Sequence, residues 1–165
     1  MESVAGIVFD ATRTQVLLIR RRDIPVWVLP GGGIEKNETP EEAACREVCE
    51  ETGLEVKIVR KIALYEPRNK LAKRTHFFEC GMIGGALTTT SESRCVRFFP
   101  LDNLPVLPPP YPFWIQDALP LTREILSKEV EGVSYWILFK LMIRHPVIVV
   151  RFLLTRMGIH INSKD

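Results

Sequence analysis

The sequence predicts an α/β domain in which a mixed sheet is covered by helices on both faces. Three observations predict this class: β-rich runs precede a well-marked helix at about 40–52, further β-rich runs follow it, and a closing helix is expected at about 114–130. This order of elements is typical of a layered α/β domain. The 165 residues suffice for one domain with its own core, or for one domain plus an appendage.

The first strands are short and lead into a run of glycines. The segments SVAGIVFD and TQVLLIRRR are β-rich and are separated by the turn-like DATR. A third strand, VWVLP, ends at Pro30, and the glycines at 31–33 stop any regular element while permitting backbone shapes that side chains forbid. Three further strands are expected in LEVKIVRKIALYE, RTHFFECGMIGG and RCVRFFP.

The helix at about 40–52 carries start and stop signals at its two ends. Thr39 is a natural N-cap, Pro40 suits the first helical position, and Glu42 completes a capping box three residues after the cap. Gly53 supplies the C-terminal stop. These signals predict the helix independently of its apolar pattern.

Three glutamates of this helix, Glu47, Glu50 and Glu51, fall on one narrow face at about 100° per residue. We expect the opposite side to pack on a sheet through a stripe formed by Cys45, Val48, Cys49 and Thr52. Like charges at this spacing repel, and they lie toward the helix C-terminus, where the helix dipole disfavours anions. A hard divalent cation would reverse both penalties; the alternative is a solvated acidic face.

The residues around these glutamates favour the cation. The pattern Gly32-x5-Glu38-x7-Arg46-Glu47-Val48-x-Glu50-Glu51-x-Gly53-Leu54 resembles, position for position, the box that defines the Nudix hydrolase family. The preceding VWVLPGG and the later RFFPLDNLP also resemble family segments, so that the resemblance extends over about residues 3–128. It implies a Nudix-like α/β/α sandwich with a mixed sheet and a loop–helix–loop catalytic motif.

The resemblance also implies roles for single residues. Glu47, Glu50, Glu51 and the carbonyl of Gly31 would bind the metal, and Arg46 would hold a box glutamate by an ion pair. Glu38, Gly32 and Gly53 would be structural in the motif. The general base would be Glu47 or Glu51; the second choice is Glu92, whose alternative reading is an exposed loop carboxylate.

The implied activity is a Mg²⁺-dependent pyrophosphohydrolase, with Mn²⁺ as a substitute, in which water attacks a phosphorus of the pyrophosphate bridge. The substrate would be a nucleoside diphosphate derivative such as an NTP, a nucleotide sugar or ADP-ribose. Two alternatives are a catalytically weak nucleotide-binding regulatory module and an RNA 5′-pyrophosphohydrolase.

Substrate contacts are expected from arginines and one tryptophan. Arg20 and Arg22 could hold phosphate, although strand alternation prevents Arg20, Arg21 and Arg22 from all facing one site. Arg74 belongs to a second cationic cluster. Trp27 could stack on a base or fill the sheet surface.

The sequence divides at about residue 130, with the Nudix-like domain over 1–130 and an apolar and basic helical appendage over 131–165. Within residues 133–156, Lys140, Arg144 and Arg151 fall on one side of a helix, and Pro146 interrupts it. Three basic residues oppose a membrane-spanning helix. We expect this segment to pack on its own domain, to form a homodimer contact, or to bind a membrane surface.

Bulk composition limits the partners and the location. A net charge of +2 does not indicate nucleic acid as an obligatory partner. The four cysteines lack metal-site spacing and are expected to be reduced core residues. The N-terminus shows no signal peptide. We therefore expect a cytoplasmic protein, with peripheral membrane contact as an option.

Overall fold

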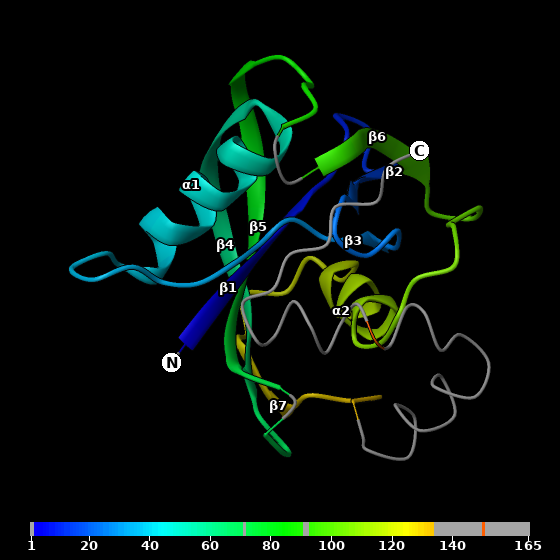
Figure 1. The fold of residues 1–165 in the computed structure, drawn as a ribbon. Helices are drawn as coiled ribbons and strands as arrows, with labels where there is room; N and C mark the ends of the chain where they lie inside the picture. Colours follow the sequence, from blue (N-terminus) through cyan, green and yellow to red (C-terminus); the bar gives the residue numbers. More distant parts are fainter. Residues whose placement is uncertain (1, 71, 91–92, 134–149, 151–165) are drawn as a thin grey trace.

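The computed structural model describes residues 2–70, 72–90, 93–133 and 150. Two helices lie on opposite sides of a group of long strands, and three shorter strands form a separate sheet beside them (Figure 1). In chain order the elements are β1 (Glu2–Val8), β2 (Gln15–Arg21), β3 (Trp27–Val28), α1 (Pro40–Thr52), β4 (Leu54–Glu66), β5 (Arg74–Gly85), β6 (Ser93–Pro100), α2 (Tyr111–Ala118) and β7 (Leu126–Glu129).

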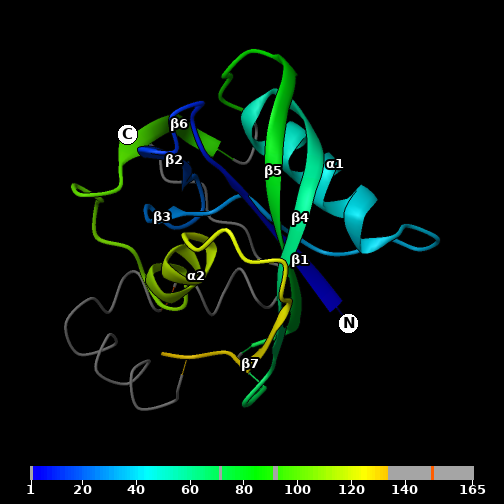
Figure 2. The ribbon, with the colours of Figure 1, turned by 180° about the vertical axis from the view of Figure 1, so that it is seen from behind.

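The larger sheet is mixed, as the sequence predicts, and has the strand order β1-β5-β4-β7. β1 pairs in parallel with β5, β4 and β5 form a long antiparallel ribbon, and β7 pairs in parallel with β4. A second, antiparallel sheet has the order β3-β2-β6. Figure 2 shows from behind how the small sheet lies beside the end of the large one. The α/β class is confirmed, and the division into two sheets is new.

Two apolar clusters fill the two sides of the large sheet. One contains Val48 of α1 together with Phe78 of β5 and Leu17 of β2. The other contains Phe77 and the α2 residue Trp114, whose ring stacks on Tyr65 with centroids 4.8 Å apart. Phe77 and Phe78 are adjacent on one strand, so their side chains point to opposite faces. Each helix therefore covers one face.

The expected closing helix at about 114–130 is wrong in extent. The helix α2 begins earlier, at Tyr111, and ends at Ala118, and residues 126–129 form a strand instead. Leu119 still has helical φ and ψ, but Pro120 has no backbone N–H to continue the hydrogen-bond ladder, so the helix ends there. Leu126 pairs with Ala63 of β4, a distant partner that the local sequence does not reveal.

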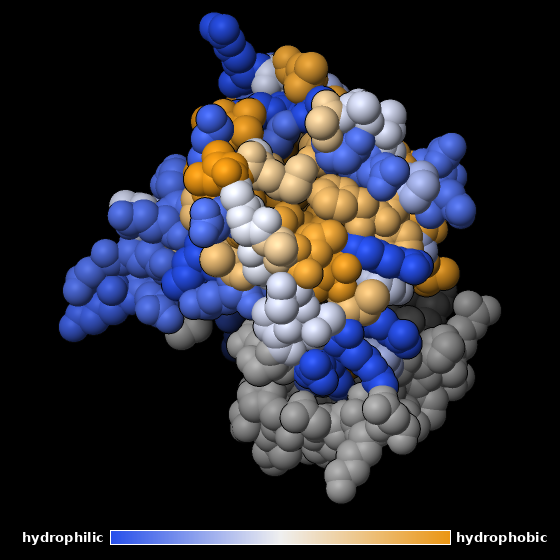
Figure 3. All heavy atoms as spheres, turned by 90° about the horizontal axis from the view of Figure 1, so that it is seen from above, coloured by the Kyte–Doolittle hydropathy of each residue, from blue (hydrophilic) through white to orange (hydrophobic). Residues whose placement is uncertain are grey.

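The surface seen from above carries an apolar area surrounded by hydrophilic side chains (Figure 3). Large apolar residues are exposed on the β4–β5 ribbon, at Val59, Met82 and Ile83. In the part of the chain that the structure describes, neither helix is long and apolar enough to cross a bilayer. The segment 133–156 lies outside the described residues except for Val133 and Val150, so its expected packing, dimer or membrane role stays a prediction.

Candidate active site

The helix α1 begins and ends as its sequence predicts. The hydroxyl of Thr39 accepts the backbone N–H of Glu42 at 3.2 Å, and the Glu42 carboxylate accepts the Thr39 N–H at 2.9 Å, which completes the capping box. Gly53 has φ 77° and donates its N–H to the carbonyl of Cys49 at 2.8 Å. Both ends are thus fixed by local hydrogen bonds, which orients the glutamates relative to the preceding glycine loop.

The packed face of α1 differs from the expected one. Val48 and Thr52 are buried as expected, but Cys49 is exposed and Cys45 is only partly buried. The buried residues of the helix are Ala43, Ala44, Val48, Glu51 and Thr52. This face includes Glu51, so packing and charge are not on opposite sides. The small side chains of Ala43 and Ala44 allow the helix to approach the sheet closely. The buried face of the helix therefore includes these two alanines and not Cys49.

The glycine loop is attached to β1 and lies directly against α1. Val4 and Gly32 exchange two backbone hydrogen bonds, of 2.9 and 3.1 Å. A β-carbon at Gly32 would lie 2.3 Å from an oxygen of Glu47, and one at Gly31 would lie 2.3 Å from the carbonyl oxygen of Val4. A side chain at either position would collide with these neighbours. The glycines therefore allow the loop backbone to lie against β1 at Gly31 and against the Glu47 carboxylate at Gly32.

Glu51 is the most buried glutamate of the group, at 5% exposure. Its Oε2 accepts the N–H of Gly31 at 2.8 Å. In this arrangement Gly31 presents its N–H to Glu51, whereas the expected role of the Gly31 carbonyl as a metal ligand stays a prediction. Glu51 joins the end of the helix to the glycine loop.

Arg46 is bonded to three of the motif's carboxylates. Its guanidinium donates to Glu38 at 2.8 and 3.0 Å, to Glu47 at 3.0 Å and to Glu50 at 3.1 Å. It also donates to the carbonyl of Gly33 at 3.0 Å. Glu38 raises the pKa of Arg46, with further contributions from Glu47 and Glu50, and Arg46 in turn lowers the pKa of Glu38. The expected ion pair is present and extends to three partners.

Carboxylates outnumber the arginine in this motif. Glu38, Glu47, Glu50 and Glu51 stand against Arg46 alone, so one guanidinium leaves three negative charges. Within the described residues no three acidic, histidine or cysteine side chains converge as metal ligands. Arg46 draws Glu47 and Glu50 toward itself, and Glu51 turns to Gly31. The donors are nevertheless all oxygens beside a glycine cradle, which suits a hard divalent cation.

The sequence did not single out Arg21 as the arginine that interacts with this site. Its guanidinium forms a two-point ion pair with Asp23, with Nε–Oδ1 at 2.8 Å and Nη2–Oδ2 at 2.5 Å. Asp23 is the largest cause of its raised pKa, and Tyr111 and Glu51 contribute less. The pairing of β2 with β6 shifts register beside it, since Arg20 lies opposite Cys95 and Arg21 opposite Ser93. In the sequence, the local indication that Arg21 is held in place is Asp23, the acidic residue two positions later.

The other predicted substrate residues lie elsewhere. Arg22 donates to the carbonyl of Thr90 at 2.9 Å, and Arg74 pairs with Glu66 at 2.8 Å and Glu2 at 3.2 Å. Arg20 is exposed on the strand β2, opposite Trp27. The partly buried Trp27 packs against the α2-side cluster, which agrees with the sheet-filling alternative. Glu92 lies outside the described residues, so its catalytic role stays untested.

Known proteins resemble this chain in sequence. A family model for the NUDIX domain matches residues 1–122. A MutT-like protein of Streptomyces ambofaciens is 38% identical over 102 residues, covering 62% of this chain and 65% of that protein. An ADP-ribose pyrophosphatase of Methanocaldococcus jannaschii is 37% identical over 101 residues, covering 56% and 59%. The chain thus spans less than two thirds of these relatives.

A solved structure shares the fold. The crystal structure of an ADP-ribose pyrophosphatase from Streptococcus suis superposes with a TM-score of 0.64 at 24% sequence identity. The match covers 76% of this chain and 97% of the other. At this identity the likeness concerns the fold alone.

Proposed function

This chain belongs to the Nudix family, and from that premise we propose that it is a Mg²⁺-dependent pyrophosphohydrolase acting on a nucleoside diphosphate derivative. The observation that carries the proposal is the excess of carboxylates on α1 beside a glycine loop that approaches them within contact distance. A structural acidic cluster would be neutralised by its own arginines. Here the guanidinium of Arg46 bonds three carboxylates, and Glu51 accepts a backbone N–H of the glycine loop. This excess of carboxylate oxygens suits a divalent cation.

Glu47, Glu50 and Glu51, with the carbonyl of Gly31, would hold the divalent ion. When bound, this ion would neutralise phosphate oxygens and acidify the attacking water. Arg46 keeps Glu47 and Glu50 on one side of the helix through its hydrogen bonds. Mn²⁺ would serve as a substitute, since it also prefers oxygen ligands.

Side chains of the site would also accept a proton from the attacking water and bind the substrate. Glu47 or Glu51 accepts the proton of the attacking water, because both carboxylates are held against the glycine loop. Arg21, held in place by Asp23 and interacting with Glu51, would bind a phosphate oxygen of the substrate. The proposed substrates are an NTP, a nucleotide sugar or ADP-ribose.

A substrate panel tests the proposal. Phosphate, pyrophosphate and nucleotide release would be measured with Mg²⁺, with Mn²⁺ and with EDTA, for NTPs, 8-oxo-dGTP, ADP-ribose, UDP-sugars, dinucleoside polyphosphates and 5′-triphosphorylated RNA. We expect metal-dependent cleavage of at least one anhydride, abolished by EDTA. Metal-independent turnover would contradict the proposed metal dependence. No turnover across the panel would contradict the enzyme and favour the regulatory module.

A further inference from the structure

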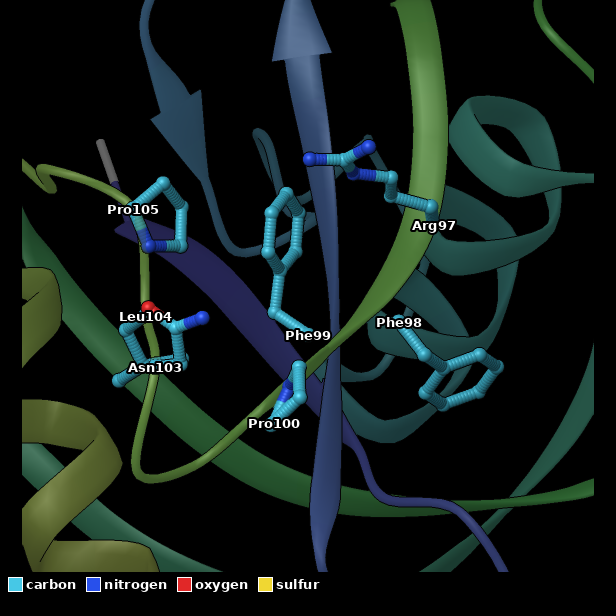
Figure 4. Close-up of a pocket in the computed structure, with 7 residues that line it drawn as sticks. All are labelled: Arg97, Phe98, Phe99, Pro100, Asn103, Leu104 and Pro105. Atoms are coloured by element: carbon cyan, nitrogen blue, oxygen red, sulfur yellow. The ribbon is translucent and has the colours of Figure 1, made fainter.

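A surface pocket lies on the small sheet, beside the loop that follows β6 (Figure 4). Its volume is about 470 Å³, within the range of small-molecule sites, and it is lined by Arg97, Phe98, Phe99, Pro100, Asn103, Leu104 and Pro105. Figure 4 shows that Phe99 and the guanidinium of Arg97 lie on the side of β6 that faces Pro105, whereas Phe98 points the other way. The pocket therefore has an aromatic and cationic wall opposite an apolar one.

The wall is built from planar groups in contact. The guanidinium carbon of Arg97 is 4.2 Å from the ring centroid of Phe99 and 5.3 Å from that of Trp27. The rings of Trp27 and Phe99 meet edge to face, with centroids 4.7 Å apart. Such packing holds a long arginine side chain in one orientation while its polar edge stays exposed.

The strand register places a second arginine on the same face. Arg20 lies opposite Trp27, and its neighbour Leu18 lies opposite Arg97. Since side chains alternate along a strand, Arg20, Trp27 and Arg97 share a face. Leu17, which precedes Leu18 and therefore points to the opposite face, packs in the cluster with α1. The arginines thus lie on the sheet face turned away from the glutamates of α1.

Arg20 does not line the pocket but is the diagonal neighbour of Arg97 across the β2–β6 pair, a separation that long side chains can span. Within the described part of the chain, neither Arg20 nor Arg97 forms an ion pair, and both are exposed. Neighbouring like charges on one sheet face are unfavourable, and an anion between them would remove that cost. Guanidinium groups bind phosphate through two parallel hydrogen bonds. The side-chain amide of Asn103 adds a donor and an acceptor at the pocket.

We propose that this pocket is a second binding site for a ligand with a phosphate group beside a flat heterocyclic ring, as in a nucleoside monophosphate. The phosphate binds Arg97 in the pocket, and Arg20 reaches it from the diagonal position on β2. The ring lies between the Phe99–Arg97 wall and the apolar side of Leu104 and Pro105. The same chemistry is present in a free nucleotide and at the 5′ end of a single-stranded oligonucleotide.

Calorimetric titration with AMP in EDTA tests the site without turnover, so its outcome is independent of the proposed enzymatic activity. We expect saturable binding at one site, weakened at least 10-fold by Arg97→Ala and by Arg20→Ala. The matched control is Arg68→Ala, which removes an exposed arginine that pairs with Glu129, and it should bind AMP as the unmodified protein does. Glu51→Gln should also leave AMP binding unchanged. Thermal denaturation of each variant confirms that it is folded.

Further titrations separate the parts of the ligand. Adenosine and inorganic phosphate should each bind at least 10-fold more weakly than AMP, since each lacks one half of the recognised chemistry. Equal affinity for phosphate and AMP would overturn the proposal, as would unchanged AMP binding in Arg97→Ala or a loss in Glu51→Gln. A 5′-phosphorylated tetra-adenylate distinguishes the sources: tighter binding than AMP, lost in Arg97→Ala, assigns the site to an oligonucleotide end.

Discussion

The two faces of the large sheet carry charge clusters of opposite balance. On the α1 face, one arginine contacts three glutamates while Glu51 turns to the glycine loop. On the α2 face, the single carboxylate Glu79 accepts from two arginines, Arg13 and Arg60, and is 6% exposed. One cluster has an excess of carboxylates and the other an excess of guanidiniums.

The two clusters differ in which groups bind their surplus charged side chains. The surplus donors around Glu79 are used by backbone carbonyls: Arg60 donates to Ala118 at 2.7 Å and to Thr122 at 3.0 Å, at the end of α2. This cluster is complete within the protein and attaches the helix end to the sheet. In the α1 cluster, Arg46 bonds Glu38, Glu47 and Glu50 and the Gly31 N–H bonds Glu51, so the carboxylates still outnumber the guanidinium within hydrogen-bond distance. Charge balance thus separates a structural cluster from a candidate metal site.

The largest expected effect comes from neutralising a carboxylate of the α1 cluster. Glu51→Gln keeps the shape of the side chain but removes a proposed metal ligand, and turnover should fall ~1,000-fold. The matched control, Glu41→Gln, changes an exposed glutamate on the first turn and should retain full turnover. Equal loss in both variants, or none in Glu51→Gln, would contradict the assignment. Steady-state kinetics at saturating Mg²⁺ measure it.

Neutralising the carboxylate on the α2 face should affect stability instead. Glu79→Gln leaves two partly buried arginines without their counter-charge, and we expect a loss of about 3 kcal/mol in the free energy of unfolding. Urea denaturation measures this change. Glu129→Gln, which removes an exposed partner of Arg68, should change it by less than about 0.5 kcal/mol. If Glu79→Gln also lowered the turnover of the folded protein, the assignment of a structural role to the Glu79 cluster would be contradicted.

Replacing the arginine of the α1 cluster should act on metal affinity. Arg46→Lys retains the positive charge but cannot bond Glu38, Glu47 and Glu50 from one planar group. The Mg²⁺ concentration for half-maximal activity should rise about 10-fold to 100-fold, with a smaller change in turnover at saturating metal. A metal titration of activity checks this, and an unchanged midpoint would show that Arg46 does not position the glutamates.

The capping box should contribute a smaller, purely local stabilisation. Thr39→Ala removes the acceptor of the Glu42 N–H and should lower the free energy of unfolding by about 1 kcal/mol. Thr39→Ser retains the acceptor and serves as the matched control. Denaturant titrations of both variants are the measurement, and equal losses would assign the effect to the methyl group.

The smallest effect concerns pH. The N–H and hydroxyl of Thr39 lower the pKa of Glu42 below its ordinary 4.5. Its ionised form is therefore favoured in the folded state, so this stabilisation is present above about pH 4.5 and is lost as pH falls through the lowered value. In Glu42→Gln the decline of unfolding free energy below pH 4.5 should be shallower than in the unmodified protein. An identical decline of the unfolding free energy below pH 4.5 in both proteins would contradict a contribution of ionised Glu42 to stability.

Local signals predicted the α1 region well. Thr39, Glu42 and Gly53 fixed both helix ends, because caps act between residues close in the chain. The strands β4 and β5 also match their predicted runs. Arg46 was placed on a box glutamate through the family resemblance, and its contact with Glu38 is present.

Distant contacts decided what the sequence could not show. Glu79 and Arg13 are 66 positions apart, so nothing local indicates their ion pair. Arg21 interacts with Glu51 and Tyr111, which lie far from it in the chain, and β7 forms a strand by pairing with β4. The buried face of α1 differs from the predicted one because Glu51 is covered by the glycine loop and not by solvent.

The attachment of the glycine loop to β1 has a consequence for synthesis on the ribosome. Gly32 is bonded to Val4, and β1 is in turn paired with β5, where Glu2 lies opposite Arg74. All the motif's glutamates emerge before the strand that fixes β1 has been translated. Pairing partners so far apart form slowly. The nascent chain therefore carries the residues of α1 and of the glycine loop before the strand that supports β1 exists. The proposed site can assemble only late, when β5 docks.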